Sequence, residues 1–182
     1  MFVVSAASRG AEPLRLTQWP TVAPQPQFDL IDGDHRRRRA ADFRGNVTIV
    51  FFGFTHCPDV CPGELFKLSL VLKRVGALAA NIRVVFITLD PERDTSELLK
   101  TYVTEFDPRF VALTGSTADI NAAANSFSIQ FATVRQGNDY TISHSTGSYV
   151  LDKTGRLRLA ATRETSIEEW VHDLRILASE PP

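Results

Sequence analysis

The sequence predicts an α/β fold in which helices flank a central mixed sheet. Residues 47–52 and 82–89 form two apolar runs rich in β-branched and aromatic side chains, with the length of strands covered on both faces. Between them, residues 62–78 place leucine and valine at helical spacing, and Pro62 is tolerated in the first turn of a helix. Two strands joined by such a helix pair in parallel through a right-handed crossover.

The flanking segments complete this pattern. An Asp-Gly pair between residues 28–31 and 36–40 predicts an N-terminal β-hairpin. Asp94 followed by Glu97 resembles a capping box and predicts a helix that reaches residue 106. Ser166 is the expected cap of a final amphipathic helix. Further short elements are expected as strands at 110–113, 141–142, 147–151 and 157–160 and as a helix at 116–124. This order of elements is that of a thioredoxin-like fold.

The length of 182 residues suits one domain. Prolines within residues 1–27 predict an irregular N-terminal segment, and we expect residues 28–182 to form the domain; these prolines are Pro13, Pro20, Pro24 and Pro26. The net charge of −1 gives no general attraction to nucleic acid or anionic lipid. No apolar stretch approaches the roughly 18 residues of a membrane span. The apolar block in residues 1–10 is too short for a signal peptide. We therefore expect the chain as given to be soluble, or to follow a removed leader or anchor.

The two cysteines stand four residues apart, in the segment CPDVC from Cys57 to Cys61. Two cysteines are too few for a disulfide scaffold, so the pair predicts a functional site. Cys57 follows the first central strand and Cys61 lies where the helix begins, at the edge of the sheet where ligands collect. The partial positive charge of a helix N-terminus favours thiolate, which is both a nucleophile and a metal ligand. A disulfide and a metal site both remain open.

Two thiolates form a soft donor set, which suits copper(I) better than structural zinc with its four ligands. A third ligand has to come from a distant part of the chain. His144 lies in a Ser-His-Ser loop before a predicted strand, although a loop histidine taken alone is more often exposed or hydrogen-bonded. We expect His56 to point away from Cys57, and His35 and His172 to lie on the surface.

Three segments of the sequence resemble the signatures of the SCO/SenC family of copper-binding proteins. They are FFGFTHCPDVCP at 51–62, TLDPERDT at 88–95 and DYTISHSTGSYVLDKTGRL at 139–157, and LTGS at 113–116 also matches. The resemblance extends from about residue 28 to the end. It implies that Cys57, Cys61 and His144 bind a copper ion, and that the protein delivers this ion to the CuA centre in subunit II of cytochrome c oxidase.

The resemblance also implies a place in the cell. Family members usually sit on the periplasmic face of a bacterial membrane or in the mitochondrial intermembrane space, held by one N-terminal transmembrane helix. We therefore expect membrane contact only through an anchor outside this chain, and a monomer. The resemblance further suggests that Asp90, after the second central strand, tunes the copper or contacts a partner; taken alone, Asp90 could simply cap the turn before Pro91. The arginines at 36–39 are expected to form a solvated edge strand rather than a docking patch for an acidic partner.

The same cysteines support a second hypothesis, a thiol–disulfide oxidoreductase that needs no metal. One thiolate would attack a partner disulfide, and the other would resolve the mixed disulfide. The resemblance allows this alternative, because some family members are thought to reduce the cysteines of subunit II or to signal redox state. A thiol peroxidase is less favoured. Thr55 precedes Cys57 by two residues, but the proline-rich loop of peroxiredoxins is missing. The leading prediction is a non-enzymatic copper chaperone.

Overall fold

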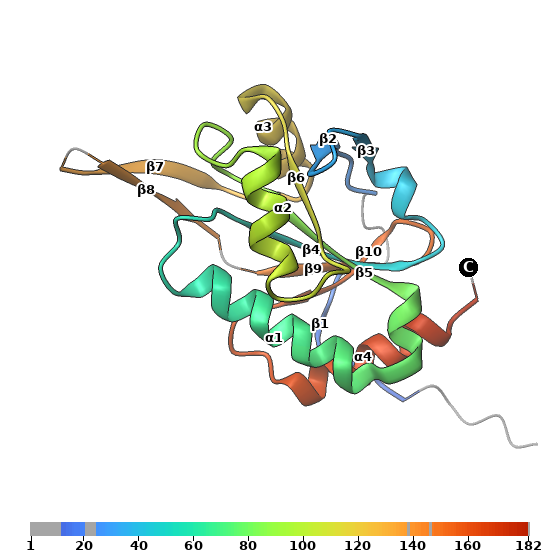
Figure 1. The fold of residues 1–182 in the computed structure, drawn as a ribbon. Coiled ribbons are helices and arrows are strands. Elements are labelled where there is room, and N and C mark those ends of the chain that lie inside the picture. Colours follow the sequence, from blue (N-terminus) through green and yellow to red (C-terminus); the bar gives the residue numbers. More distant parts are fainter. Residues whose placement is uncertain (1–11, 21–24, 138, 146, 182) are drawn as a thin grey trace, which may run out of the picture.

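The protein is described by a computed structural model that covers residues 12–20, 25–137, 139–145 and 147–181 (Figure 1). The first ten residues, for which no signal peptide was predicted, lie outside these ranges, as does Pro24 of the N-terminal segment. None of the helices within these ranges is long and apolar enough to cross a membrane.

Eight strands within the described ranges form one mixed sheet. They are β1 (Thr17–Gln18), β2 (Asp29–Asp32), β3 (Arg37–Arg39), β4 (Val47–Gly53), β5 (Ile82–Thr88), β6 (Val111–Thr114), β9 (Ser148–Leu151) and β10 (Leu157–Ala161). Their order is β1-β10-β9-β4-β5-β6-β2-β3. β4 pairs in parallel with β5, and β5 with β6, whereas the other neighbours are antiparallel. The predicted parallel pair therefore lies at the centre of the sheet.

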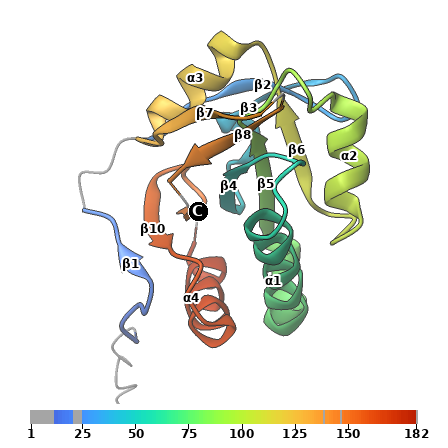
Figure 2. The same cartoon turned by 90° about the vertical axis from the view of Figure 1, so that its left-hand side faces the viewer.

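Helices cover both faces of this sheet. They are α1 (Val60–Val75), α2 (Ser96–Thr104), α3 (Thr117–Ser126) and α4 (Ile167–Ser179), with the 3₁₀ helices η1 (Ala40–Phe43) and η2 (Gly76–Asn81). Figures 1 and 2 show α1 and α4 on one side and α3 on the other. Val47, Ile49 and Phe51 of β4 pack with α1 and α4, whereas Val50 and Phe52 pack with α3. Burial on both faces of β4 and the flanking helices confirm the predicted thioredoxin-like fold.

The N-terminal segment contains more structure than predicted for residues 1–27. β1 lies in this segment and pairs antiparallel with β10. Just before β1, the buried carboxylate of Asp173 in α4 accepts the backbone N–H groups of Arg15, at 2.9 and 3.0 Å, and Leu16, at 2.8 Å. The prolines carry no information on a distant carboxylate that satisfies this backbone.

The helix after β4 begins and ends earlier than predicted. α1 starts at Val60 rather than Pro62, so Cys61 lies in its first turn. It ends at Val75, because Gly76 adopts a positive φ of 78° and the chain continues as η2. Glycine favours this left-handed region, which ends many helices.

The start of α2 also differs from the prediction. Thr95, and not Asp94, is the N-cap, and its hydroxyl oxygen accepts the N–H of Leu98 at 3.3 Å. Asp94 is fully buried, and its carboxylate accepts hydrogen bonds from the hydroxyl groups of Thr55 and Thr88. Both residue types can cap a helix, and the buried hydroxyl partners of Asp94 decide between them.

The predicted N-terminal hairpin is present, as β2 and β3, and β3 forms an edge of the sheet. Asp29 pairs with the guanidinium groups of Arg37, at 2.6 Å, and Arg39, at 3.1 Å. Arg38 lies over the ring of Phe43, 5.0 Å from its centre. These three arginines therefore have partners within the chain, and β3 is a largely exposed edge strand.

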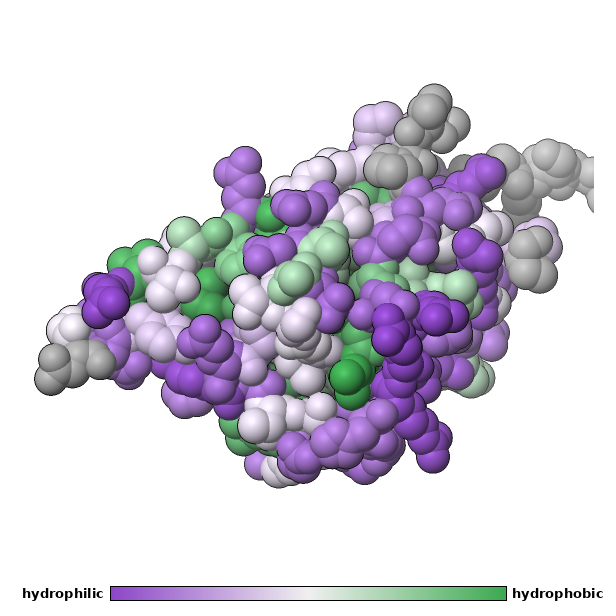
Figure 3. Space-filling model, turned by 90° about the horizontal axis from the view of Figure 1, so that it is seen from above, coloured by the Kyte–Doolittle hydropathy of each residue, from purple (hydrophilic) through white to green (hydrophobic). Residues whose placement is uncertain are grey.

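A second hairpin, which was not predicted, projects from the body of the molecule (Figure 1). It consists of β7 (Phe131–Gln136) and β8 (Asp139–His144), of which only residues 141–142 were expected to form a strand. Figure 3 shows small apolar areas on a mostly hydrophilic surface in this part of the molecule, and Val134 is 43% exposed. His144 is the last residue of β8, so this hairpin positions a predicted copper ligand.

Candidate metal centre

The two cysteines meet at the start of α1. Cys57 is half-buried in the loop after β4, and Cys61 is fully buried in the first turn of the helix. The backbone N–H of Cys61 donates to the sulfur of Cys57, with a nitrogen–sulfur distance of 3.4 Å. Asp59, the N-cap residue, makes no capping hydrogen bond with its side chain. The Cys57 sulfur therefore acts as an acceptor for the exposed N–H groups of this helix end.

This arrangement makes the two thiols unequal. A hydrogen bond from the side chain of Cys61, aided by the N–H groups of the helix start, lowers the pKa of Cys57 to about 5 in spite of partial burial. The same hydrogen bond and burial raise the pKa of Cys61. Cys57 is thus a thiolate at neutral pH, and Cys61 holds the remaining proton.

Gly53 makes room for the Cys61 sulfur. It is the last residue of β4, and a Cβ atom added there would lie 2.8 Å from Cys61 Sγ and 2.9 Å from Cε2 of Phe86. Carbon atoms normally pack at roughly 3.5–4.0 Å. The central strand therefore accommodates the sulfur only because this residue has no side chain.

His144 lies beside the cysteine loop. Its ring packs edge-on against the ring of Phe54, with 6.3 Å between the centres. The carbonyl oxygen of Phe54 accepts the N–H of Cys57 at 3.3 Å, and Phe54, Ile142 and Cys57 pack in one apolar cluster. Phe54 therefore links the end of β8 to the cysteine loop, which are 87 residues apart in sequence from Cys57 to His144. Among the described residues, the sulfurs of Cys57 and Cys61 and a ring nitrogen of His144 do not all lie within 4.8 Å of one another.

The ring of His144 is oriented by its own backbone. Nδ1 lies 3.0 Å from the carbonyl oxygen of Ser145, which can only accept a hydrogen bond. This contact assigns the proton of the neutral ring to Nδ1 and leaves the lone pair on Nε2. Metal-binding histidines commonly use this pattern, in which the second nitrogen donates to a carbonyl group.

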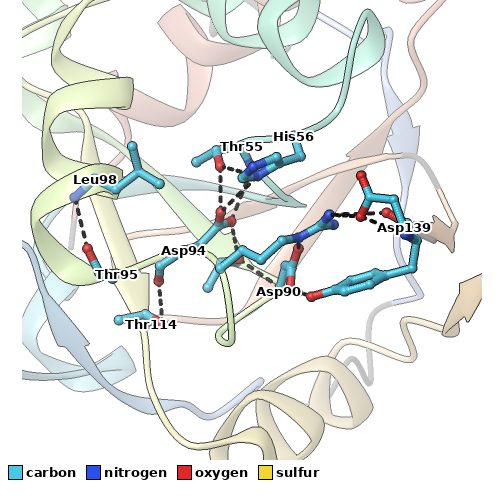
Figure 4. A network of polar contacts seen from close by, with 11 residues as sticks. Thr55, His56, Asp90, Asp94, Thr95, Leu98, Thr114 and Asp139 are labelled. Atoms are coloured by element: carbon cyan, nitrogen blue, oxygen red, sulfur yellow. Dashed lines mark hydrogen bonds and ion pairs between the residues drawn. The ribbon is translucent and has the colours of Figure 1, made fainter.

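Asp90 belongs to a polar network next to the cysteine loop (Figure 4). Its carboxylate accepts the phenol hydroxyl of Tyr140 at 2.8 Å and pairs with Nε of Arg93 at 2.5 Å. The guanidinium of Arg93 lies over the Tyr140 ring, 3.8 Å from its centre, and reaches Asp139 at 3.2 Å. The Asp90 side chain therefore holds the beginning of β8, while its carbonyl oxygen accepts the N–H groups of the following turn.

Asp94, for which the sequence pattern predicts only a role as a helix cap, contacts the beginning of the cysteine loop. Its carboxylate accepts the N–H of Thr55 at 3.1 Å and the Thr88 hydroxyl at 2.6 Å. Nδ1 of His56 lies 3.1 Å from the Thr55 hydroxyl and 3.9 Å from the carboxylate of Asp94. Figure 4 shows His56 between these two residues and the loop that carries it. His56 thus faces Asp94, and together with Asp90 their possible ligand atoms lie within 4.8 Å of one another. Burial with hydroxyl partners has no signature in a single sequence.

The other two histidines contact carboxylate groups elsewhere in the molecule. His35 is exposed and lies 2.6 Å from Glu97, and His172 bridges Glu12 and Asp173 at 2.9 and 2.7 Å. Neither contact involves the cysteine loop. His35 is a surface residue, as predicted, whereas the His172 side chain is only 13% exposed.

A thioredoxin-like sheet with paired cysteines at the first turn after its central strand defines a class of proteins that act through thiols. Comparison with known proteins assigns the chain to one family within this class. The SCO1/SenC family model matches residues 19–179, and the chain belongs to this family.

The relatives agree with this assignment. The chain is 40% identical over 155 residues to "Protein SCO2 homolog, mitochondrial" of Homo sapiens, covering 83% of this chain and 58% of that protein. It is 39% identical over 132 residues to an SCO2-like protein of Rickettsia prowazekii, covering 71% and 64% of the two chains. The chain thus spans less than two thirds of the length of these relatives. The solved structure of Bradyrhizobium japonicum ScoI with copper bound has a TM-score of 0.77 and 36% identity, covering 83% of this chain and 97% of that chain.

Proposed function

We propose that the protein binds one copper ion through the sulfurs of Cys57 and Cys61 and the imidazole of His144, and delivers it to the CuA site in subunit II of cytochrome c oxidase. The observation that carries this proposal is the packing of the His144 ring against Phe54, whose carbonyl oxygen accepts the N–H of Cys57. Copper is the cargo of this protein rather than a permanent part of it.

The donor groups suit a soft ion. Cys57 is ionised at neutral pH, and copper binding would displace the proton that Cys61 holds. Two thiolates and one neutral imidazole are ligands that copper(I) accepts. The orientation of His144, with its proton on Nδ1, leaves Nε2 as the ligand atom. The copper-bound structure of ScoI, a protein with 36% identity, further supports copper as the cargo.

Delivery would proceed by exchange of ligands between donor and acceptor. Of the two sulfurs, that of Cys57 belongs to a half-buried residue and that of Cys61 to a fully buried one, so the Cys57 sulfur would be the first to share the ion with incoming cysteines. Transfer would be directional if the acceptor binds copper more tightly, or if Cys57 and Cys61 are oxidised after release. The periplasmic or intermembrane compartment that we propose would allow such oxidation, and the human relative is named as mitochondrial.

In this proposal Asp90 adjusts the site indirectly. It holds Arg93 and Tyr140 against the beginning of β8, and His144 ends the same strand. Burial and the hydrogen bond to Asp90 raise the pKa of Tyr140 to about 12, so this phenol remains a donor at physiological pH. Asp90 thus helps to set where the third ligand lies.

The test is a copper(I) titration of the reduced protein in competition with a chromogenic chelator, under anaerobic conditions. His144→Ala should weaken copper affinity by about tenfold or more, which is about 1.4 kcal/mol or more, without loss of the fold. His35→Ala is the matched control, since His35 contacts Glu97 on the surface. Equal copper affinity of the His144→Ala variant and the wild type would exclude His144 from the site.

A second function is favoured by the unequal pKa values of the cysteines. In a thiol–disulfide exchange, the Cys57 thiolate would attack a partner disulfide and release one partner thiolate. Cys61 would then lose its proton and attack the Cys57 sulfur, forming the Cys57–Cys61 disulfide and releasing the second partner thiolate. The partner gains the two electrons that the cysteine pair loses. Reductase activity that survives in His144→Ala would identify this function, because the exchange needs no third ligand.

A further inference from the structure

Glu64 is a buried acidic residue one turn after Cys61 on α1. It is 6% exposed and lies on the face of the helix that packs against the sheet. Carboxylates are rarely buried in this way unless partners satisfy them. The contacts of Glu64 therefore indicate why the helix keeps a charge at this position.

Both oxygen atoms of the Glu64 carboxylate have partners. Oε1 accepts the hydroxyl of Ser148 at 3.0 Å, and Oε2 pairs with the ammonium group of Lys67 at 2.8 Å. Lys67 also donates to the backbone carbonyl oxygen of Arg163 at 2.9 Å. Lys67 thus balances the negative charge of the Glu64 carboxylate through Oε2. The other oxygen, Oε1, accepts its hydrogen bond from Ser148, which belongs to another element of the fold.

Ser148 is the first residue of β9 and follows His144 by four positions. It is 1% exposed and lies opposite Phe51 in the antiparallel pairing of β9 with β4. The Glu64–Ser148 hydrogen bond therefore joins the helix turn that carries Cys61 to the strand that begins just after His144. It crosses between the two parts of the candidate metal centre that are far apart in sequence.

We propose that Glu64 is a positioning residue, which through Ser148 fixes the His144 end of β8 relative to the first turn of α1. The hydrogen bond restrains the chain on the far side of His144, while Asp90 and Arg93 restrain β8 at its beginning. The consequence for copper rests on the function proposed above; the restraint itself does not depend on it.

The hydroxyl of Ser148 is the more informative group to remove, because Ser148→Ala leaves the Glu64–Lys67 ion pair intact. Ser69→Ala is the matched control. Ser69 is also buried, at 2% exposure, but its hydroxyl donates to the carbonyl oxygen of Phe66 within α1, at 2.7 Å. Each variant loses one buried hydroxyl hydrogen bond, and only Ser148→Ala disconnects α1 from β9.

The first measurement uses the copper-free, reduced protein. The backbone N–H of Ser145 donates to the carbonyl oxygen of Gln130 at 3.1 Å, next to His144. Its hydrogen exchange should be faster in Ser148→Ala than in Ser69→Ala, at matched distance from the unfolding midpoint of each variant. Equal exchange in the two variants would overturn the proposal, because a merely structural loss affects both alike.

The second measurement is the copper(I) titration. Ser148→Ala should lose about tenfold in affinity, as is typical when a residue that orients a ligand is removed, whereas Ser69→Ala should match the wild type. Glu64→Gln should recover most of the affinity lost in Glu64→Ala, since an amide oxygen still accepts the Ser148 hydroxyl. Faster Ser145 exchange together with unchanged copper affinity in both Ser148→Ala and His144→Ala would support the restraint and refute the copper site. Loss of affinity in His144→Ala but not in Ser148→Ala would refute the role of Glu64.

Discussion

Replacing Gly53 by alanine tests how closely the central strand packs against the Cys61 sulfur. The added Cβ would lie 2.8 Å from Sγ of Cys61 and 2.9 Å from Cε2 of Phe86. Since carbon atoms pack at roughly 3.5–4.0 Å, the two neighbours must move by about 0.6–0.7 Å or more. Both neighbours are fully buried, so neither can turn into solvent.

Overpacking of this kind costs about 1–3 kcal/mol in unfolding free energy. For a chain of this size, that loss lowers the melting temperature by roughly 2–12 °C. Of the two neighbours, the Cys61 sulfur is easier to displace than the Phe86 ring. Displacing this sulfur should also reduce copper affinity.

Gly63→Ala is the matched control for this experiment. A Cβ at Gly63, two residues after Cys61, would meet no atom within 4 Å. Alanine there should raise stability by about 0.5–1 kcal/mol, as in other helix interiors. Thermal unfolding followed by circular dichroism compares the two variants. A Gly53→Ala protein as stable as the wild type would refute the packing argument.

Three further predictions follow from the described contacts. Iodoacetamide should modify Cys57 well before Cys61 in the native protein, and the rate of Cys57 modification should fall as the pH is lowered through about 5, where the Cys57 thiolate is lost. Peptide mass spectrometry measures the modification of each cysteine. Equal rates for Cys57 and Cys61 would contradict the assigned pKa difference. Asp173→Ala should lower the unfolding free energy by about 1–3 kcal/mol and release the segment leading to β1. Amide hydrogen exchange in this segment should become faster. Unchanged exchange would show that the carboxylate does not hold the segment. The guanidinium of Arg109 lowers the pKa of Asp107, so the carboxylate stabilises the fold above the unfolded value of about 3.9 and progressively less as the pH falls below it. Asp107→Asn should therefore have a lower free energy of unfolding than the wild type at pH 7. In denaturation experiments below about pH 3.9, the difference in unfolding free energy between the two proteins should shrink. A difference independent of pH would refute the ion pair.

The central strands and α1 could be predicted well from the sequence, because buried segments have a clear pattern of apolar residues. β4 and β5 are apolar on both faces, and α1 between them repeats leucine and valine at helical spacing. The spacing of Cys57 and Cys61 likewise placed both sulfurs at one helix end. These features depend on local geometry, which a short stretch of sequence contains.

The hairpin of β7 and β8 was largely missed for the opposite reason. Most residues of β7 are exposed, so no alternation of apolar and polar residues marks it as a strand. The position of His144 near the cysteine loop depends on this hairpin and on the contact between the His144 and Phe54 rings. Residue patterns therefore left His144 as an ordinary loop residue, and only the resemblance to a family singled it out.

Asp94 shows a different limit. Its position before a helix was read correctly, but threonine and aspartate compete for the same capping role. The choice depends on the hydroxyl groups of Thr55 and Thr88, which approach from other elements. Contacts between distant segments decide such cases.

The hydrogen bond from the Cys61 amide to the Cys57 sulfur has a consequence for the proposed exchange of copper. The sulfur that would coordinate an ion also completes the hydrogen bonding of the α1 N-terminus. A thiolate has three lone pairs, so the sulfur could coordinate an ion while it still accepts this hydrogen bond. If the proposed copper site is correct, the helix start would need little rearrangement when an ion binds or leaves, which would favour exchange of the ion with an acceptor.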